Sequence, residues 1–243
     1  NTVIKMTNWS IESLNPVQRK IVEHKSGPAL VIAGAGSGKT RVITHRVAKL
    51  IQTGIPASSI LLLTFTNKAA NEMAQRVGRA LKNHTEQQKI IHGTFHSVGS
   101  RFLRRNAKLL NYKNNFSILD SSDSRDLIKA SMAETIGKPG KYFPKAAVLQ
   151  NIFSLAFNRF STQQMILDST YPERNFHLEQ LVSADYPHFY ENIEPMLKVL
   201  TNYRRKKIRG QVMDFDDLLE NWLELLLRYG EGIPLCRQIQ YIL

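Results

Sequence analysis

Seven consecutive residues carry the most specific chemistry in this sequence, GAGSGKT at 34–40. The apolar run ALVIA (29–33) before them predicts a buried strand, and RVITHRVAKLI (41–51) after them has the spacing of an amphipathic helix. A glycine-rich turn between a strand and a helix points consecutive backbone N–H groups and the positive end of the helix dipole at one place. Lys39 would then reach the β- and γ-phosphates, and Thr40 would hold Mg²⁺. The segment therefore predicts a nucleoside triphosphate site.

The phosphate-loop pattern G-x-x-x-x-G-K-[ST] departs at one position, because Ala33 stands where the pattern has glycine. One methyl group at the entrance of the loop is a mild change, and the GSGKT core is intact. The alternative is a glycine turn that occurs by chance. The strand and helix expected on the correct sides argue against it.

Length and composition indicate an ordinary globular chain. It has 243 residues, enough for one large or two modest domains, with 42% hydrophobic and 22% charged residues. A single cysteine, Cys236, excludes an intramolecular disulfide framework, fits a reducing compartment and is expected in the core. We find no signal peptide and no run of 18 apolar residues, so a membrane role is not expected. The chain begins at Asn1 rather than Met, which suggests trimming at its start.

The formal net charge of +13 is concentrated in the part of the chain that holds the phosphate loop. Residues 1–112 contain 17 Lys and Arg against 4 Asp and Glu. A basic nucleotide-binding domain favours a polyanionic partner, most simply nucleic acid. A surface charge that serves only solubility is the alternative.

Strands and helices are expected to alternate in this first part. ILLLTF (60–65) and KIIHGTF (89–95) read as buried strands, each followed by a helix, at 67–81 and 97–110, with a break in the first helix at 83–85. This alternation predicts a parallel α/β sheet.

The pattern changes after about residue 112. Helices are expected at 122–136, 145–160 and 190–209, and no strand is expected between 113 and 211. A further helix at 213–230 and a last buried strand at 237–243 follow. The stretch 113–211 therefore reads as a helical subdomain inserted into the α/β domain.

Five segments, in order, resemble superfamily 1A helicases of the UvrD/Rep/PcrA type across nearly the whole chain. They are LNPVQ (14–18), AGAGSGKT (33–40), TFTNKAANEM (64–73), GTFHS (93–97) and MDFDDLL (213–219). The resemblance implies an incomplete RecA-like P-loop NTPase parallel sheet, formed by 1–112 and 212–243. The all-helical insertion would be 113–211, starting between about 97 and 115. Alanine at position 33 is normal for this branch.

The resemblance also implies the ligands of the loop, ATP and Mg²⁺. Gln18 would read the adenine edge through its amide, and Lys39 and Thr40 would be the catalytic residues of the loop, with Thr40 on the metal. The complete set expected to bind the nucleotide is Gln18, Ala33, Gly34, Ala35, Gly36, Ser37, Gly38, Lys39, Thr40 and Arg41.

Six residues at or just after strand ends are implied to contact nucleic acid: Thr64, Phe65, Asn67, Thr94, Phe95 and His96. Ligands of an open parallel sheet gather at the carboxyl ends of its strands. An exposed aromatic ring there can stack on any base. The alternatives are that Phe65 and Phe95 belong to the core and that His96 is a structural histidine.

Two charged clusters have two interpretations each. The run RRKKIR (204–209) is either a solvated helix face or a patch that touches phosphates. Asp214, Asp216 and Asp217 could suggest a metal site, but we expect them to cap the first turn of a helix.

The implied function is that of an ATP-dependent 3′–5′ DNA helicase acting in repair or replication, in the bacterial cytoplasm near the nucleoid. Its partners would be single-stranded DNA, the junction with duplex, and further helicase domains. The chain stops before the family's DE-containing motif, so we expect residues 1–243 alone to bind nucleotide weakly and to hydrolyse it negligibly.

Other classes remain as alternatives. A GTPase would need N-K-x-D, whereas the nearest candidate, Asn67-Lys68-Ala69-Ala70, lacks the aspartate. A nucleotide kinase would need an arginine-rich lid, and none is assigned. A third possibility is a non-catalytic module that binds DNA or a partner. TFTNKAA favours the UvrD/Rep/PcrA branch over the RecB-like branch, and the pathway stays open.

Overall fold

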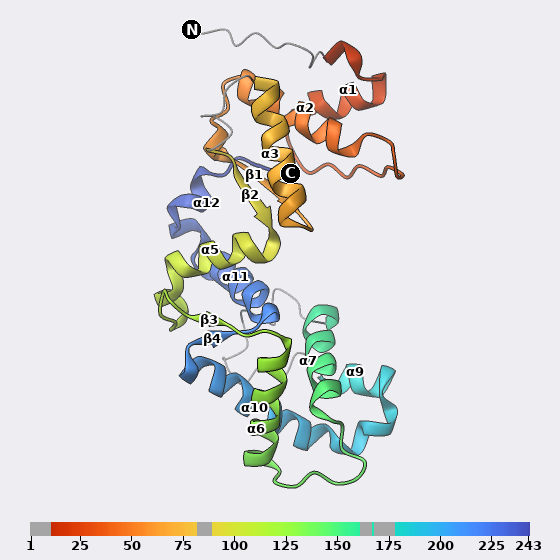
Figure 1. Ribbon diagram of the computed structural model, residues 1–243, viewed down its shortest axis with the longest axis vertical. Coiled ribbons are helices and arrows are strands. Elements are labelled where there is room, and N and C mark those ends of the chain that lie inside the picture. The colour runs from red at the N-terminus through yellow and green to blue at the C-terminus, as the bar shows by residue number, and fades with distance from the viewer. Residues whose placement is uncertain (1–10, 82–88, 161–166, 168–177) are drawn as a thin grey trace. The chain divides into compact units, whose positions relative to one another are not determined.

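The computed structural model describes residues 11–81, 89–160, 167 and 178–243, apart from the side chain of Phe160 (Figure 1). The expected helix break at 83–85 lies outside the described residues. The chain divides into two compact units, one formed within 1–98 and 231–243 and the other by 99–230. The sequence-based subdomain boundaries at 112 and 212 stay a prediction.

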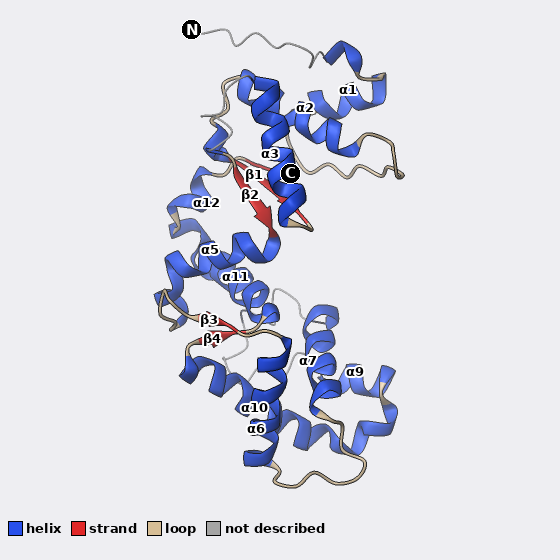
Figure 2. Ribbon diagram, viewed as in Figure 1, coloured by secondary structure: helices blue, strands red, loops and turns tan. Residues whose placement is uncertain are grey.

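A parallel sheet forms the centre of the first unit, as predicted (Figure 2). Its strands are β1 (Ile60–Thr64), β2 (Ile91–Thr94) and β5 (Tyr241–Ile242), in the order β2-β1-β5. In the register of β1 and β2, Leu61 lies opposite Ile91 and Thr64 lies opposite Thr94. The apolar start of β1 is buried, which fits a strand covered by helices.

Helices α2 (Lys39–Gln52) and α3 (Asn67–Leu81) pack against this sheet in one core. The 3₁₀ turn η2 (Ala57–Ser59) precedes β1, and η5 (Gly230–Gly232) and the short α12 (Pro234–Gln238) precede β5. Helix α3 contacts α2, β1 and β2. Its apolar residues recur at helical spacing, so Met73 and Val77 enter the same core as Ile60 and Leu62 of β1. This core holds α2 and α3 against β1.

A short helix, α1 (Pro16–Glu23), follows the 3₁₀ turn η1 (Ile11–Ser13) and packs against α2. Arg46 of α2 is buried and donates hydrogen bonds from Nη1 to the carbonyls of Ile21 (3.0 Å) and His24 (2.6 Å). Carbonyls at a helix end have no partner within the helix, and a cation suits that end. Arg46 therefore fixes α1 to the helix that carries the phosphate loop.

The prediction of a buried strand at 29–33 was wrong. This segment has no strand pairing in the described residues, and Leu30 and Ile32 are 89% and 91% exposed. Apolar β-branched residues favour a strand only when neighbouring strands supply hydrogen bonds and a surface to pack on. β1 pairs with β2 and with β5, and none of these strands pairs with this segment.

Three smaller predictions also need correction. The expected strand at 237–243 is reduced to Tyr241–Ile242, because Pro234 begins α12 and that helix continues to Gln238. Cys236, on α12, is only partly buried and is not a core residue. The expected helix at 97–110 is α5 (Phe95–Asn106), which ends in the 3₁₀ turn η3 (Ala107–Leu110).

The second unit is helical, as predicted. Besides the part of α5 from Gly99 and η3, it contains α6 (Ser121–Thr135), α7 (Ala146–Phe160), α9 (Leu178–Asp185), η4 (Pro187–Asn192), α10 (Ile193–Gly210) and α11 (Phe215–Tyr229). Helix α6 packs on α7 and α10 around a core that includes Ile128, Ile152 and Val199. In the part of the chain that the structure describes, no helix is long and apolar enough to cross a membrane.

One feature of this unit was not predicted. β3 (Ser117–Ile118) and β4 (Val212–Met213) form a parallel pair, although no strand was expected between 113 and 211. The backbone N–H groups of Ser117 and Leu119 donate to the carbonyls of Gln211 (3.1 Å) and Met213 (2.8 Å). Two residues are too few to show a period of two, so sequence periodicity cannot detect such a pair.

Candidate nucleotide site and nucleic-acid interface

The phosphate loop has the backbone that its glycines permit. Gly36 and Gly38 have φ values of 75° and 83°, a region that residues with a Cβ rarely adopt. Gly38 is the N-cap residue of α2, and its carbonyl accepts a hydrogen bond from the N–H of Val42 (3.0 Å). The Ser37 hydroxyl donates to the Gly34 carbonyl (2.8 Å) and closes the turn. The loop therefore leads directly into the amino end of a 14-residue helix.

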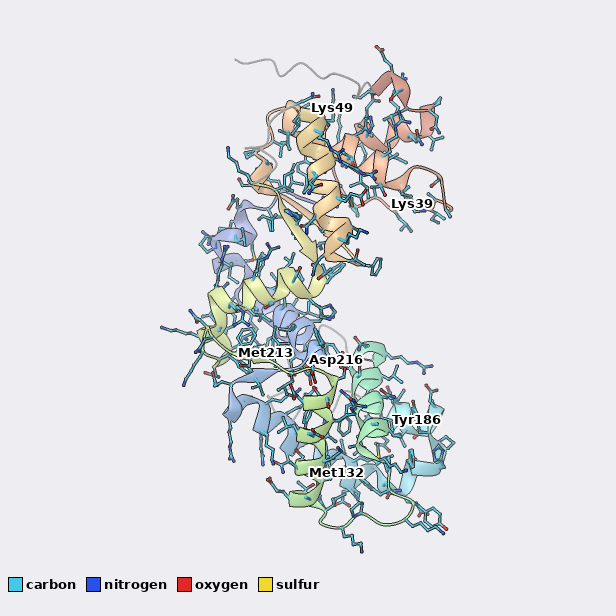
Figure 3. The ribbon with its side chains drawn as sticks, in the orientation of Figure 1. Lys39, Lys49, Met132, Tyr186, Met213 and Asp216 are labelled. Atoms are coloured by element: carbon cyan, nitrogen blue, oxygen red, sulfur yellow. The ribbon has the colours of Figure 1, made fainter. Side chains whose placement is uncertain are left out.

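Lys39, labelled in Figure 3, and Thr40 are the first two residues of α2. Lys39 Nζ donates to the carbonyls of Ala33 (3.1 Å) and Gly34 (2.6 Å), so the ammonium group lies against the entrance of the loop. Both side chains are exposed. A phosphate oxygen could replace one of the carbonyls as a partner of Lys39, since an ammonium group has three donors on a flexible stem. The residues present therefore fit a triphosphate with its metal.

A mainly apolar cavity of about 360 Å³ adjoins the loop. Its lining includes Val17 and Gln18 of α1, Ile32 before the loop, and Lys39 and Val42 of α2. Cavities that hold small ligands begin at about 300 Å³ and combine apolar walls with a few polar groups. A base could lie against the apolar wall, with the Gln18 amide as the polar group that reads its edge.

The other loop residues predicted to bind the nucleotide have different partners in the structure. Ala33 provides a carbonyl to Lys39, and the exposed residues Gly34, Ala35 and Ser37 belong to the turn. The Arg41 guanidinium donates from Nη2 to Ser13 Oγ (2.7 Å) and so connects α2 to η1. A role of Arg41 in binding nucleotide stays a prediction.

The structure brings the predicted nucleic-acid residues of β1 and β2 together. Thr64 and Thr94 are register partners and are the last residues of their parallel strands, so both lie at the carboxyl edge of the sheet. The Thr64 hydroxyl donates to the Thr66 carbonyl (2.7 Å), and the Thr94 hydroxyl accepts from the N–H of Ser97 (3.2 Å). Each threonine thus also fixes the start of the helix that follows its strand.

The two phenylalanines at this edge are exposed. Phe65 follows Thr64 and is 97% exposed, and Phe95 follows Thr94 and is 48% exposed. The alternative that they belong to the core is therefore wrong for both. Asn67 is the exposed first residue of α3, and His96, in the first turn of α5, is partly buried. An uncovered ring beside two strand ends is the arrangement on which a base can stack.

The two charged clusters lie in the second unit and form one network. Asp214 is the N-cap residue of α11 and forms a capping box with Asp217, which confirms the predicted capping role. Both carboxylates also accept from Lys207 Nζ of α10, at 2.6 and 2.7 Å. Arg204 Nη2 donates to Glu220 at 3.3 Å, and both are buried. Two of the five basic residues of the expected patch at 204–209, Arg204 and Lys207, are therefore interior.

One residue of the nucleotide site was missed from sequence. The Asn15 side chain caps α1 by accepting from the N–H of Gln18, and Gln18 returns a bond to the N–H of Asn15. The spacing Asn-x-x-Gln before an apolar run is the signature of such a capping box and could have revealed it.

Comparison with known proteins agrees with this geometry. Residues 14–243 match the UvrD/REP helicase N-terminal domain. The chain is 36% identical over 239 residues to the ATP-dependent DNA helicase PcrA of Bacillus subtilis. The aligned residues make up 98% of this chain and 29% of that protein. Proteins of the same name from Staphylococcus epidermidis and Staphylococcus aureus are 32% and 31% identical over 237 residues, 97% of this chain and 30% of theirs. The chain thus spans less than a third of the length of these relatives.

Proposed function

Because this chain belongs to the UvrD/REP helicase family, we propose that it binds MgATP and single-stranded DNA as part of an ATP-dependent 3′–5′ DNA helicase. The observation that carries the proposal is the exposed ring of Phe65, placed beside Thr64 and Thr94 at one edge of the sheet. The phosphate loop belongs to the same unit. Nucleotide and DNA would thus bind to one structural body.

At the loop, the backbone N–H groups at the start of α2 would bind the phosphates, and Lys39 would exchange the carbonyls of Ala33 and Gly34 for β- and γ-phosphate oxygens. The Thr40 hydroxyl would ligate Mg²⁺, which neutralises charge that develops on the phosphates. Gln18 would contact the base. These residues bind and orient the nucleotide.

At the strand ends, Phe65 would stack on a base, an interaction worth about 1–3 kcal/mol per base and tolerant of sequence. Thr64, Asn67, Thr94 and His96 would contact phosphate or sugar, and Phe95 would extend the stacking surface. Phosphate and sugar contacts position the strand and do not read its sequence. This combination suits a motor that must move along any sequence.

We further propose that residues 1–243 by themselves hydrolyse ATP slowly. Phosphoryl transfer needs a group that orients water and cations that stabilise the transition state, and an arginine supplied for this purpose is worth about 10³–10⁵ in rate. Among the described residues, the cavity beside the loop is lined by no carboxylate and no arginine. In the whole protein, further helicase domains would supply these groups. Its substrate would be a junction of single- and double-stranded DNA, in repair or replication, near the bacterial nucleoid.

The test is ATP hydrolysis by the full-length protein with and without oligo-dT, with Lys39→Ala as the control. We expect strong stimulation by DNA that Lys39→Ala abolishes, and little hydrolysis by residues 1–243 alone. Hydrolysis that is indifferent to DNA would contradict the helicase function. Rapid hydrolysis by residues 1–243 would contradict the proposed need for further domains.

A further inference from the structure

The side-chain amide of Gln18 is held at both ends. Its Oε1 accepts from the backbone N–H of Asn15 (3.2 Å), and its Nε2 donates to the backbone carbonyl of Ser37 (3.1 Å). Asn15 precedes α1, whereas Ser37 lies in the phosphate loop, 19 positions beyond Gln18. The amide therefore connects the start of α1 with the phosphate loop.

These two partners determine which way the amide faces. A backbone N–H can only donate and a backbone carbonyl can only accept, so Oε1 must face Asn15 and Nε2 must face Ser37. The opposite orientation would set two donors against each other at Asn15 and two acceptors against each other at Ser37. Each end keeps one further site, a lone pair on Oε1 and a hydrogen on Nε2.

The remaining sites fit adenine and do not fit guanine. Adenine presents an N6 donor beside the N7 acceptor, which a glutamine amide pairs with through one accepted and one donated hydrogen bond. Guanine presents two acceptors, O6 and N7, at the same edge. A freely turning amide also has only one donor group, so it cannot satisfy both acceptors of guanine. Holding the amide in place adds to the preference for adenine, because binding then no longer costs the entropy of ordering this side chain.

Asn15 is the residue that fixes this arrangement. Its Oδ1 accepts from the backbone N–H of Gln18 at 2.8 Å, and Pro16 after it occupies the first position of α1. Without this side chain, the first turn of α1 loses its cap, and the Gln18 backbone is held less firmly relative to Ser37, although Arg46 still holds the other end of α1. Asn15 also lines the cavity beside the loop, but its side-chain oxygen is bonded to the Gln18 backbone, so we assign its role through Gln18.

We propose that Asn15 is a positioning residue for base selection: together with the Ser37 carbonyl, it holds the Gln18 amide in the orientation that pairs with adenine. This inference rests on the proposed function, since it requires a purine nucleotide in the loop. It adds that base selection depends on the conformation of the phosphate loop, because Ser37 belongs to that loop and its hydroxyl closes the turn at Gly34.

The test measures binding of MgATP, MgGTP and inorganic tripolyphosphate to the full-length protein by calorimetry. One good bidentate contact discriminates between bases by about 5- to 100-fold. We expect a preference of that order for ATP over GTP. Asn15→Ala is expected to lower the ATP:GTP ratio by about threefold or more and to leave the affinity for tripolyphosphate unchanged. Asn15→Asp keeps an acceptor at the cap and is expected to restore the ratio.

Two further variants separate positioning from a general loss of stability. In a Gln18→Ala background, Asn15→Ala should change the ratio no further, because its effect passes through Gln18. Asp120, which caps α6 in the second unit by accepting from Ser122 and Asp123, offers a matched cap. Asp120→Ala should leave the ratio at its wild-type value.

The outcomes distinguish the inference from the proposed function. If the wild-type protein prefers ATP and Asn15→Ala has the same ratio, or if Asn15→Ala still lowers the ratio without Gln18, the positioning role is overturned and nucleotide binding stands. If wild type binds neither nucleotide, or if Lys39→Ala binds both as wild type does, the proposed nucleotide site itself fails.

Discussion

At the scale of single residues, Phe65 combines high exposure with a place directly after a strand end of the sheet. A ring that is 97% exposed contributes little to packing, so Phe65→Ala is expected to leave the free energy of unfolding within about 0.5 kcal/mol of wild type. Its affinity for oligo-dT should fall by about 1–3 kcal/mol, the value of one stacked base. Fluorescence anisotropy with labelled oligo-dT measures this loss.

Tyr142 provides the matched control for this prediction. It is 77% exposed, lies in the second unit and is not part of the strand-end edge. Tyr142→Ala should bind oligo-dT as wild type does. Equal affinities of Phe65→Ala and wild type would show that the exposed ring does not stack on DNA.

Asp217 leads to a prediction about pH. Burial, together with the charge of Asp214, raises the pKa of the Asp217 carboxyl from 3.8 to about 7, although Lys207 acts in the opposite direction. The native state therefore holds this proton between about pH 4 and 7, where the unfolded chain has released it. The contribution of this raised pKa to the free energy of unfolding is therefore fully present below about pH 4, and it is lost as the pH rises through 7. Asp214 behaves oppositely: Lys207 overcomes the effect of burial and lowers its pKa to about 2, below this window.

Asp217→Asn removes the titration, so the stability advantage of wild type over this variant should shrink as the pH rises from 4.5 to 7.5. Urea unfolding followed by Trp222 fluorescence, with Trp9→Phe in every protein, measures it in the second unit. Asp216→Asn is the control and should keep the wild-type pH dependence. A constant difference between wild type and Asp217→Asn would show that Asp217 does not retain its proton.

Residue identity predicted the nucleotide site better than it predicted burial. The type and spacing of GSGKT specify the turn and its helix, because only glycine suits the backbone at positions 36 and 38. An aromatic residue after a strand looks the same in sequence whether it enters the core or faces solvent, so the exposure of Phe95 could not be decided. Arg204 and Lys207 were read as part of a surface run, since their buried partners Glu220 and Asp217 come 16 and 10 residues later.

At the scale of elements, Gly99 shows why a poor helix former occupies α5. A Cβ at this position would lie 2.9 Å from Trp222 Cε3 and 3.2 Å from Trp222 Cδ2. Trp222 is itself buried and packs on Phe102, with ring centroids 5.6 Å apart. Alanine normally stabilises a helix interior by up to about 1 kcal/mol relative to glycine. Here overpacking, typically about 1–3 kcal/mol, outweighs that gain.

Gly99→Ala is therefore expected to lower the free energy of unfolding of the second unit by about 1 kcal/mol, again read from Trp222. Gly210, the last residue of α10, is the matched control, because a Cβ there would meet Val212 Cγ2 at an ordinary 3.7 Å. Gly210→Ala should be neutral or slightly stabilising. If Gly99→Ala is as stable as wild type, the packing of α5 on Trp222 is looser than these distances indicate.

Element prediction succeeded where the pattern is local and failed where it depends on partners. The helix at 67–81 has the predicted bounds because its apolar stripe is complete within the segment. The segment 29–33 has the composition of a strand, but a strand forms only against a neighbour, and composition does not name the neighbour. The pair β3 and β4 joins residues nearly 100 positions apart, which sequence patterns do not reveal.

At the scale of the whole molecule, the net charge of +13 makes a prediction about salt that is separate from stacking. Binding of single-stranded DNA should weaken as salt rises, with a slope of log K against log[salt] of about −0.7 per phosphate contact. Lys68, exposed in the first turn of α3 next to Asn67, is suited to such a contact. Lys68→Gln should weaken binding at low salt and make the slope less steep by about 0.7.

The affinities of Phe65→Ala and Lys68→Gln for DNA should then depend differently on salt. Phe65→Ala lowers affinity by a similar factor at every salt concentration, because stacking releases no counterions, whereas the effect of Lys68→Gln fades as salt rises. Lys129, an exposed lysine of α6 that pairs with Asp126 in the second unit, is the control for a general change of charge. If Lys129→Gln alters the slope as much as Lys68→Gln, the protein attracts DNA through its overall charge and not through the edge formed by β1 and β2.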